Sequence, residues 1–315
     1  MLMKRFGIIA LCAIIAISLL FTSCKKEQEG VYNPKKKIER IYKEIQDKVY
    51  DNNEVAQLDV PKYLCEEWNW NGDKLNTITY YGDDGAQFET ATFSYEGNRI
   101  SQIYEYFTLQ GEQGYCYSFV YQNDLISSIR QYYDQELCGE YQFTHTGNKI
   151  TRIELYYKDY KKKIGQSSLI SPLSFILPNM NMEDTRINRF DNKKSEGLVI
   201  GYTYELEWDG ENISKVKFRV DDYNEQYEYS YDTKMNPFYG SFLGIHENGS
   251  GVVFDGIPWV TSKNNIITMR YTDFEGWNVT ETRNYSYKGK YPVTCTREGT
   301  RPNGTYREIS YYEYQ

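Results

Sequence analysis

One motif recurs along this chain and constrains its fold more than any other feature of the sequence. It reads aromatic-x-aromatic-x-Gly-Asn-x-Ile-x-x-Ile, and a clear copy runs from Phe93 to Ile103. Further copies begin at Trp68, Phe119, Phe143 and Leu206, and weaker ones begin at Tyr229, Asn264 and Tyr285. The second aromatic position recurs about every 25 residues, and a unit of that length without helix signals holds two strands and two turns. The sequence therefore predicts an all-β fold, built as a long antiparallel meander of hairpin repeats with about 16 strands.

Each repeat carries its own local geometry. Gly97 and Asn98 between two strand-like runs predict a two-residue hairpin turn, because both residue types tolerate positive φ. Such a turn places Tyr95 opposite Ile100 as a cross-strand pair. Ile103 then falls on the other face of the sheet unless a β-bulge intervenes, so we expect both faces to carry some apolar surface.

Tyrosine dominates the aromatic content of the chain, with 33 Tyr against 14 Phe and 5 Trp. Tyrosine favours strands, and it packs an apolar ring while its hydroxyl reaches a polar partner. Exposed aromatic side chains on such a sheet suit flat ligands such as sugar rings or extended peptides. The candidate ligand-facing residues are the repeat aromatics Trp68, Trp70, Tyr95, Tyr121, Trp208 and Tyr231.

The N-terminus has the form of a secretory signal over residues 1–23. Lys4 and Arg5 precede an apolar run that ends at Phe21, and this run is too short for a comfortable transmembrane helix. The segment from Leu20 to Cys24 resembles the lipobox of bacterial lipoproteins, which implies that Cys24 becomes the acylated first residue of the mature chain. Acyl chains there would anchor the following domain firmly, and the polar residues 24–34 suit a solvated tether.

Two stretches depart from the repeat. Residues 35–57 place Ile38, Ile41 and Ile45 at helical spacing after Pro34, which predicts a short amphipathic N-terminal helix packed on the sheet or on a partner. Residues 164–200 predict an irregular insert, with a boundary between two domains as the rival interpretation. The β-repeat region is otherwise expected to form a single domain over 60–315.

Composition argues against several function classes. The net charge of −8 makes a nucleic-acid partner unfavourable, since such a protein needs a basic face. Two histidines and scattered acids offer no motif for a metal or a cofactor, and no nucleophile motif is present, so we predict a protein that is not an enzyme. His145 occupies the aromatic position of one repeat and is interpreted as a packing residue. Four cysteines remain after the signal, and their spacing matches no zinc or redox pattern: Cys65, Cys116, Cys138 and Cys295.

Several short motifs resemble known families. The hairpin repeat is similar to YD/RHS repeats, and a closer resemblance is to Bacteroidetes lipoproteins of unknown function with a porin-like fold. The features that carry it are the lipobox, the stretch from Tyr229 to Pro237, Lys263-Asn264-Asn265 before an apolar strand, and the late Gly289 to Pro292. The resemblance implies a curved sheet or a porin-like barrel, and it implies no reaction.

Three functions compete on this basis. The leading hypothesis is a non-enzymatic binding or scaffolding module, lipid-anchored in the cell envelope at the outer membrane, either exposed on the cell surface or facing the periplasm, with a glycan or protein ligand. The second is a hydrolase acting on polysaccharide or peptidoglycan, which needs two convergent carboxylates. The third is a membrane-embedded β-barrel, which needs an outward apolar band. Adjacent carboxylates occur at Glu66-Glu67, Asp83-Asp84 and Asp221-Asp222, and we interpret them as solvated loop charges.

Overall fold

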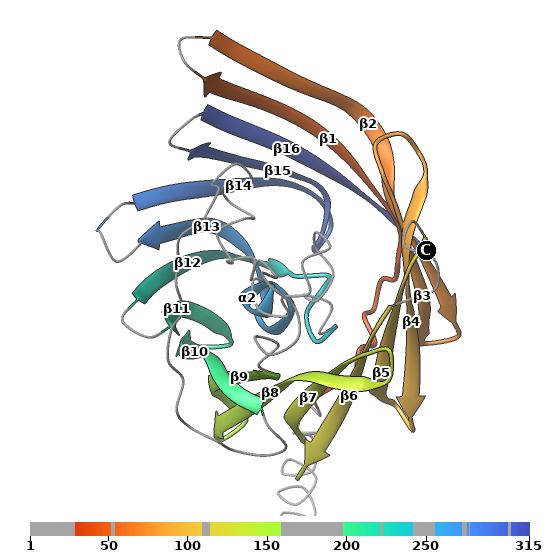
Figure 1. The fold of residues 1–315 in the computed structure, drawn as a ribbon. Coiled ribbons are helices and arrows are strands. Elements are labelled where there is room, and N and C mark those ends of the chain that lie inside the picture. The colour runs from red at the N-terminus through yellow and green to blue at the C-terminus, as the bar shows by residue number, and fades with distance from the viewer. Residues whose placement is uncertain are drawn as a thin grey trace, which may run out of the picture.

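The described chain folds into sixteen antiparallel strands that form one closed barrel (Figure 1). The computed structural model describes residues 29–51, 54–108, 114–158, 198–220, 223–241, 256–272, 276, 278–301 and 304–315. The strands are β1 (Ile38–Asp51), β2 (Glu54–Asn71), β3 (Lys74–Tyr81), β4 (Gln87–Glu96), β5 (Arg99–Phe107), β6 (Tyr115–Gln122), β7 (Leu125–Tyr133), β8 (Glu136–Thr146), β9 (Lys149–Lys158), β10 (Leu198–Asp209), β11 (Asn212–Val220), β12 (Tyr223–Met235), β13 (Asn264–Thr272), β14 (Asn278–Lys288), β15 (Tyr291–Arg301) and β16 (Gly304–Tyr314). One short helix, α2 (Ile257–Thr261), lies inside the ring of strands. The predicted all-β meander is confirmed, and the sheet closes.

Closure joins the two ends of the chain. Every strand pairs with its neighbours in sequence, and β1 also pairs with β16 in a register that sets Ile41 opposite Tyr312. The backbone N–H of Gln315 donates a 2.9 Å hydrogen bond to the carbonyl of Lys37. β16 and β1 therefore form one more repeat unit, and the chain termini interrupt it where the other units have their turn.

The two ends of the barrel differ in their connections. At one end, two-residue turns join β2 to β3, β4 to β5, β6 to β7, β8 to β9, β10 to β11 and β14 to β15. β1 begins and β16 ends there too, so we call it the tight-turn end. The opposite end also has two-residue turns, such as that between β7 and β8, but it carries longer connections too, such as that between β3 and β4 over residues 82–86, and we call it the loop end.

The turns follow the predicted hairpin chemistry with one refinement. Gly97 has φ +61°, whereas Asn98 has negative φ, which is the pattern of a type II′ turn with Gly at its first position. The β6–β7 turn lacks glycine, and both Asn123 (φ +53°) and Asp124 (φ +70°) take left-handed backbone. That turn has the pattern of type I′, which Asn and Asp tolerate better than other side chains.

A β-bulge in each repeat decides which way the isoleucines point. Tyr95 lies opposite Ile100 as predicted, but Ser94 lies opposite Gln102, so Ser101 is an extra residue on β5. The bulge turns both Ile100 and Ile103 inward, where they are fully buried. The bulge that we allowed for is therefore present, Ile103 lies on the same face as Ile100, and the expectation of apolar surface on both faces is wrong in this unit.

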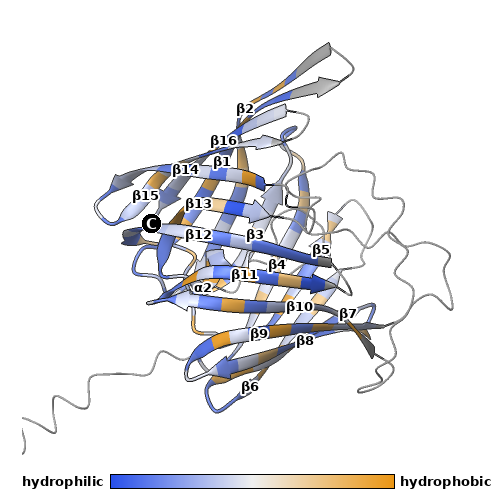
Figure 2. Cartoon of the chain, turned by 90° about the vertical axis from the view of Figure 1, so that its left-hand side faces the viewer, coloured by the Kyte–Doolittle hydropathy of each residue, from blue (hydrophilic) through white to orange (hydrophobic). Residues whose placement is uncertain are grey.

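Hydrophilic and hydrophobic residues alternate along the strands (Figure 2), and burial gives the inner and outer faces of the barrel opposite character. Inner positions carry the buried isoleucines and aromatic rings. Outer positions carry polar side chains, as in β14, where Thr280, Thr282, Asn284 and Ser286 are all exposed. Among the described residues only two large hydrophobic side chains, Leu58 and Tyr104, are exposed. The hydrophobic core of this protein therefore lies inside the barrel.

A segment between β12 and β13 enters the barrel at the tight-turn end. Residues 236–241 and 256–263, which we call the plug, include α2 and place Phe238 inside the ring of strands. The Phe238 ring lies 5.6 Å from the Trp259 ring and 6.1 Å from the Tyr312 ring of β16. Tyr32, from the segment before β1, donates a 2.9 Å hydrogen bond to the carbonyl of Pro237. The plug therefore fills the mouth of the barrel at this end.

The amphipathic helix expected over residues 35–57 is absent, because β1 and β2 occupy that stretch. Ile38 and Ile41 have the three-residue spacing of a helix face, but a bulge at Glu39 brings both to the inner face of a strand. The barrel accordingly begins at Ile38 rather than at residue 60. No described helix is long and apolar enough to cross a membrane.

Other expectations fall outside the described residues. The signal over 1–23, Cys24 and the tether as far as residue 28 lie there, and so does most of the insert near 164–200, of which Leu198–Ile200 belong to β10. No disulfide joins the four cysteines of the described residues, Cys65, Cys116, Cys138 and Cys295.

Candidate functional site

The repeat aromatics form a belt of hydrogen bonds around the tight-turn end. The Tyr121 hydroxyl of β6 donates a 2.6 Å hydrogen bond to the carbonyl of Ile100, near the start of β5. We call the second aromatic position of each repeat its slot, and six other slots donate in the same way to a backbone carbonyl. The bonds are Trp70 to Ile38 (2.7 Å), Tyr95 to Leu75 (2.8 Å), Trp208 to Ile150 (2.7 Å), Tyr231 to Ile213 (2.6 Å), Tyr285 to Ile266 (3.0 Å) and Tyr314 to Pro292 (2.8 Å). Each bond satisfies a carbonyl at the strand edge that would otherwise be costly to bury.

This belt is where the structure places the predicted ligand-facing residues. Trp70, Tyr95, Tyr121, Trp208 and Tyr231 are half-buried and use their polar atoms on the backbone. Trp68 is buried, and its Nε1 donates a 2.8 Å hydrogen bond to Glu66. Because these polar atoms are hydrogen-bonded within the protein, any ligand would contact the ring faces. The role of these residues in ligand binding remains a prediction.

His145 fills the slot of the β8 unit in a different way. Its Nε2 lies 3.1 Å from Oε1 of Glu29, and Oε2 of Glu29 accepts a 2.7 Å hydrogen bond from the backbone N–H of Ile126. The imidazole is shorter than the phenol and indole side chains of the other slots, and Glu29 bridges it to the neighbouring strand β7. The consequence is that Glu29, close to the N-terminus, is held at the tight-turn end beside β7 and β8.

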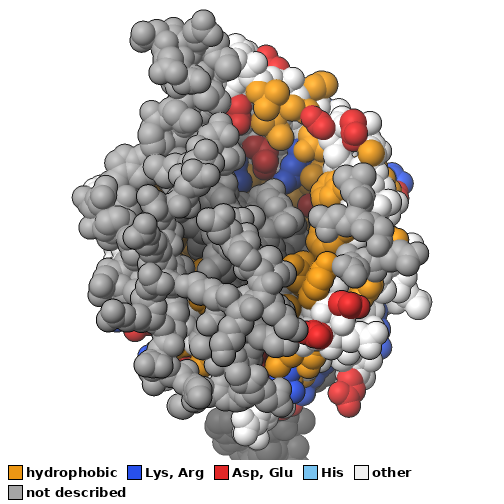
Figure 3. Space-filling model, viewed as in Figure 1, with side chains coloured by type: hydrophobic (Ala, Val, Ile, Leu, Met, Phe, Trp, Pro, Cys, Tyr) orange, Lys and Arg blue, Asp and Glu red, His pale blue; other side chains and the backbone are white. Residues whose placement is uncertain are grey.

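A cluster of charges lies on the inner face, deeper than the belt. Glu281 of β14 is fully buried and accepts a 2.7 Å hydrogen bond from Nε of Arg283 and a 2.6 Å hydrogen bond from Nε of Arg297. The Tyr306 hydroxyl also donates to Glu281. The guanidinium of Arg283 lies 4.1 Å from the centre of the Trp259 ring in the plug. Figure 3 shows acidic and basic side chains among hydrophobic ones inside the hollow of the barrel.

The environment sets the protonation of this cluster. Burial alone would raise the pKa of Glu281, but the positive charges of Arg283 and Arg297 and the hydrogen bonds outweigh it and lower that pKa to about 2. Glu281 is therefore ionised at neutral pH. Sequence reasoning missed this cluster, although alternation places Val279, Glu281, Arg283 and Tyr285 on one face, so that two charges appear at inner positions.

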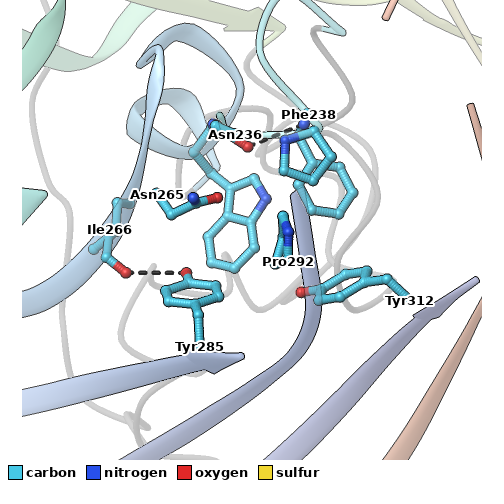
Figure 4. Close-up of a pocket in the computed structure, with 9 residues that line it drawn as sticks. Asn236, Phe238, Asn265, Ile266, Tyr285, Pro292 and Tyr312 are labelled. Atoms are coloured by element: carbon cyan, nitrogen blue, oxygen red, sulfur yellow. Dashed lines mark hydrogen bonds between the residues drawn. The ribbon is translucent and has the colours of Figure 1, made fainter. Parts of the chain in front are cut away.

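The plug leaves little free space around itself (Figure 4). A cavity of about 10 Å³ remains between Asn236, Phe238, Asn265, Tyr285 and Tyr312. That volume holds one water molecule at most. The side-chain amide of Asn236 donates a 2.8 Å hydrogen bond to the carbonyl of Ser262, which ties the two halves of the plug together. This mouth is therefore a closed structural element rather than a ligand cavity.

A larger pocket opens beside the plug at the same end. It measures about 180 Å³ and is lined by Lys36, Lys288, Tyr291, Val293, Tyr312 and Tyr314. Nζ of Lys36 lies 5.8 Å from the ring centres of both Tyr291 and Tyr314, and these two rings lie 5.9 Å apart. Within the described part of the chain, Lys36 and Lys288 form no ion pair. The pocket thus offers two ammonium groups and aromatic ring faces to an occupant.

The carboxylate pairs noted in the sequence do not converge. Glu66 points inward to Trp68, whereas Glu67 lies on the outer face, 3.3 Å from Nε of Arg40. Asp83 and Asp84 are exposed between β3 and β4, and residues 221–222 lie outside the described residues. Over the described ranges, no group of three His, Cys, Asp or Glu side chains has the arrangement of a metal site.

Comparisons with known proteins concern the fold. No protein-family model and no curated protein matches this chain. A porin-like protein from Bacteroides uniformis aligns over 88% of this chain and 98% of its own, with 10% identity and a TM-score of 0.47. A porin-like protein from Bacteroides vulgatus aligns over 86% of this chain and 97% of its own, with 9% identity and a TM-score of 0.26. No ligand or activity follows for this chain from these likenesses.

Proposed function

We propose that this chain is a lipid-anchored barrel of the cell envelope that works in water as a non-enzymatic binding or scaffolding module. The observation that carries the proposal is the polar outer wall. Cross-strand ion pairs cover it, such as Lys217 with Glu207 at 2.6 Å and Arg219 with Glu205 at 3.1 Å. A lysine or arginine on a lipid-facing strand costs about 2–4 kcal/mol at the bilayer midplane, so a wall of this kind favours water.

The anchor follows from the sequence. Cys24 ends a lipobox-like segment, and acylation there would hold a water-soluble barrel at a membrane without spanning strands. The tether and the barrel then have separate roles. The lipid holds the protein at the membrane, and the outer wall of the barrel lies in solvent. The ligand-binding side would be the inner wall of the barrel or the aromatic rings at its ends.

The test is membrane association of the full chain with and without its cysteine. Cys24→Ala should move the protein from the membrane pellet to the soluble fraction after lysis without detergent. Cys12→Ala, the same change inside the apolar run of the signal, should leave it in the pellet. If Cys24→Ala protein stays in the pellet after carbonate extraction, the barrel is embedded and the proposal is wrong.

One observation favours the embedded barrel as a second candidate. The sheet is closed and has an even number of strands, as bacterial outer-membrane barrels do. The carbonate extraction of Cys24→Ala protein separates the anchored barrel from the embedded barrel, because a spanning barrel needs no lipid to remain in the pellet. A protease-shaving experiment on intact cells then tests whether the domain faces the cell exterior.

A further inference from the structure

The position of Glu29 fixes which end of the barrel can approach a membrane. Its backbone N–H donates a 3.3 Å hydrogen bond to the carbonyl of Asp124 in the β6–β7 turn, and its carboxylate binds the N–H of Ile126. Gly30 is held next to it, because its carbonyl accepts a 2.9 Å hydrogen bond from the N–H of Ile100. The chain is thus tied to the tight-turn end from residue 29 on.

Covalent geometry limits the distance from that point to the anchor. Cys24 precedes Glu29 by five residues, which span at most about 18 Å even when fully extended. A lipid on Cys24 therefore keeps the tight-turn end within about that distance of the bilayer. The loop end, on the far side of the barrel, has no such tie.

The tight-turn end also carries the lysine-lined pocket. Lys288 directly precedes the β14–β15 turn, and Lys36 precedes β1 at the same end. Lys290 in that turn is exposed and adds a third lysine to this end of the barrel. In the described part of the chain none of these three lysines has a carboxylate partner, although the chain as a whole is acidic with a net charge of −8.

We infer that the tight-turn end faces the bilayer and that the pocket between Lys36, Lys288, Tyr291 and Tyr314 binds the phosphate of an anionic lipid headgroup. The inference rests on the proposed anchor at Cys24. The pocket's volume of about 180 Å³ exceeds by more than tenfold the space that one ordered water needs, so a phosphate and part of its glycerol fit. Lys36 and Lys288 supply charge, and the tyrosine rings supply a face for the glycerol carbons.

The experiment measures binding of the unlipidated chain, residues 25–315, to vesicles, so that it does not depend on acylation. Vesicles of phosphatidylglycerol mixed with phosphatidylcholine should bind the protein, and phosphatidylcholine alone should not. The double variant Lys36→Gln/Lys288→Gln should bind the anionic vesicles roughly 25-fold more weakly, at about fivefold per lysine. The matched control Lys215→Gln/Lys217→Gln removes the same charge from the outer wall of β11 and should bind as the parent does.

Three results would overturn the inference: equal binding to both vesicle types, an equal loss in the two double variants, or a thermal shift by inorganic phosphate without vesicle binding. The last result would mean that the pocket takes a free anion. If the Cys24→Ala protein stays in the membrane pellet, the proposed anchor is refuted. The vesicle measurement does not depend on that result, so the two proposals can fail separately.

Discussion

Aromatic side chains in this barrel donate hydrogen bonds to backbone carbonyls, a role that backbone N–H groups play elsewhere in a sheet. In seven of the eight even-numbered strands the repeat aromatic donates to a carbonyl near the start of the preceding odd-numbered strand, as Tyr121 and Tyr95 do, and β8 carries His145 instead. Burial raises the pKa of Tyr95 to about 12, so its hydroxyl stays protonated and donates across the working pH range. The belt thereby gives a structural role to five of the 33 tyrosines, before any ligand is considered.

Tyr121→Phe should lower the free energy of unfolding by about 1–2 kcal/mol, because it leaves the carbonyl of Ile100 without its donor. Urea denaturation gives the value. Tyr104→Phe is the control, since Tyr104 is 42% exposed on the outer face, and it should change stability by less than about 0.5 kcal/mol. Equal effects of the two substitutions would contradict the role given to the belt.

Glu281→Gln should lower the free energy of unfolding at pH 7 by about 3–5 kcal/mol, because Arg283 and Arg297 lose the charge that compensates them. The pKa of Glu281 is about 2 in the folded protein against 4.5 for the unperturbed group, so its contribution is complete above pH 4.5 and is lost as the pH falls toward 2. The gap between parent and variant should therefore shrink over that interval.

Urea unfolding at pH 7, 4 and 3 measures this convergence. Glu298→Gln serves as the control, because Glu298 forms an exposed pair with Arg307 at 2.9 Å on the outer face. Its effect should stay below about 1 kcal/mol. A gap between parent and Glu281→Gln that is constant with pH would show that the Glu281 carboxylate is not ionised in the fold.

At the scale of strands, the bulge separates what the sequence could predict from what it could not. The hairpins, their turns and the cross-strand pair of Tyr95 with Ile100 follow from local chemistry. The bulge that turns Ile103 inward depends on packing inside a closed sheet, so alternation alone predicted the wrong face. Ile38 and Ile41 have the same three-residue spacing as Ile100 and Ile103, and there it predicted a helix. In the structure these two residues form the isoleucine part of a repeat unit on strand β1. Charged inner residues such as Glu281 were missed because their partners lie on other strands.

The segment before β1 depends on one glycine. Gly30 has φ +78°, and a Cβ there would lie 1.9 Å from the Tyr121 hydroxyl oxygen. Gly30→Ala should therefore displace residues 29–36 and speed tryptic cleavage at Lys35 and Lys36. Gly97→Ala, also at positive φ but with nothing within 4 Å, should strain its turn and leave this cleavage unchanged. Equal cleavage rates would show that the segment is held by other contacts.

At the scale of the whole molecule, the seam between β1 and β16 decides whether a barrel exists. Tyr312 and Tyr314 stand opposite Ile41 and Ile38, and they complete the eighth unit from both ends of the chain. Because the wall is polar outside and apolar inside, an open seam would expose the core to water.

Removal of residues 311–315 should abolish cooperative urea unfolding, because it deletes Tyr312 and Tyr314, the inner aromatic side chains at the tight-turn end of the seam. Near-ultraviolet circular dichroism and the sharpness of the transition are the measurements. Glu313→Ala removes an exposed side chain from the same strand and should unfold as the parent does. A cooperative transition in the truncated chain would show that the barrel closes without the last part of β16.

The seam also sets when this protein can fold. β16, 11 residues long, is the last strand to be made, and its partner β1 is the first. Until those final residues emerge, β1 and β15 each present an edge with unpaired N–H and C=O groups, which is a template for pairing with other chains. Bringing the two ends together also carries the entropy of closing the longest loop that the chain contains. A chain that lacks β16 would thus be prone to aggregation, and we expect its folding to require a chaperone until β16 has been made.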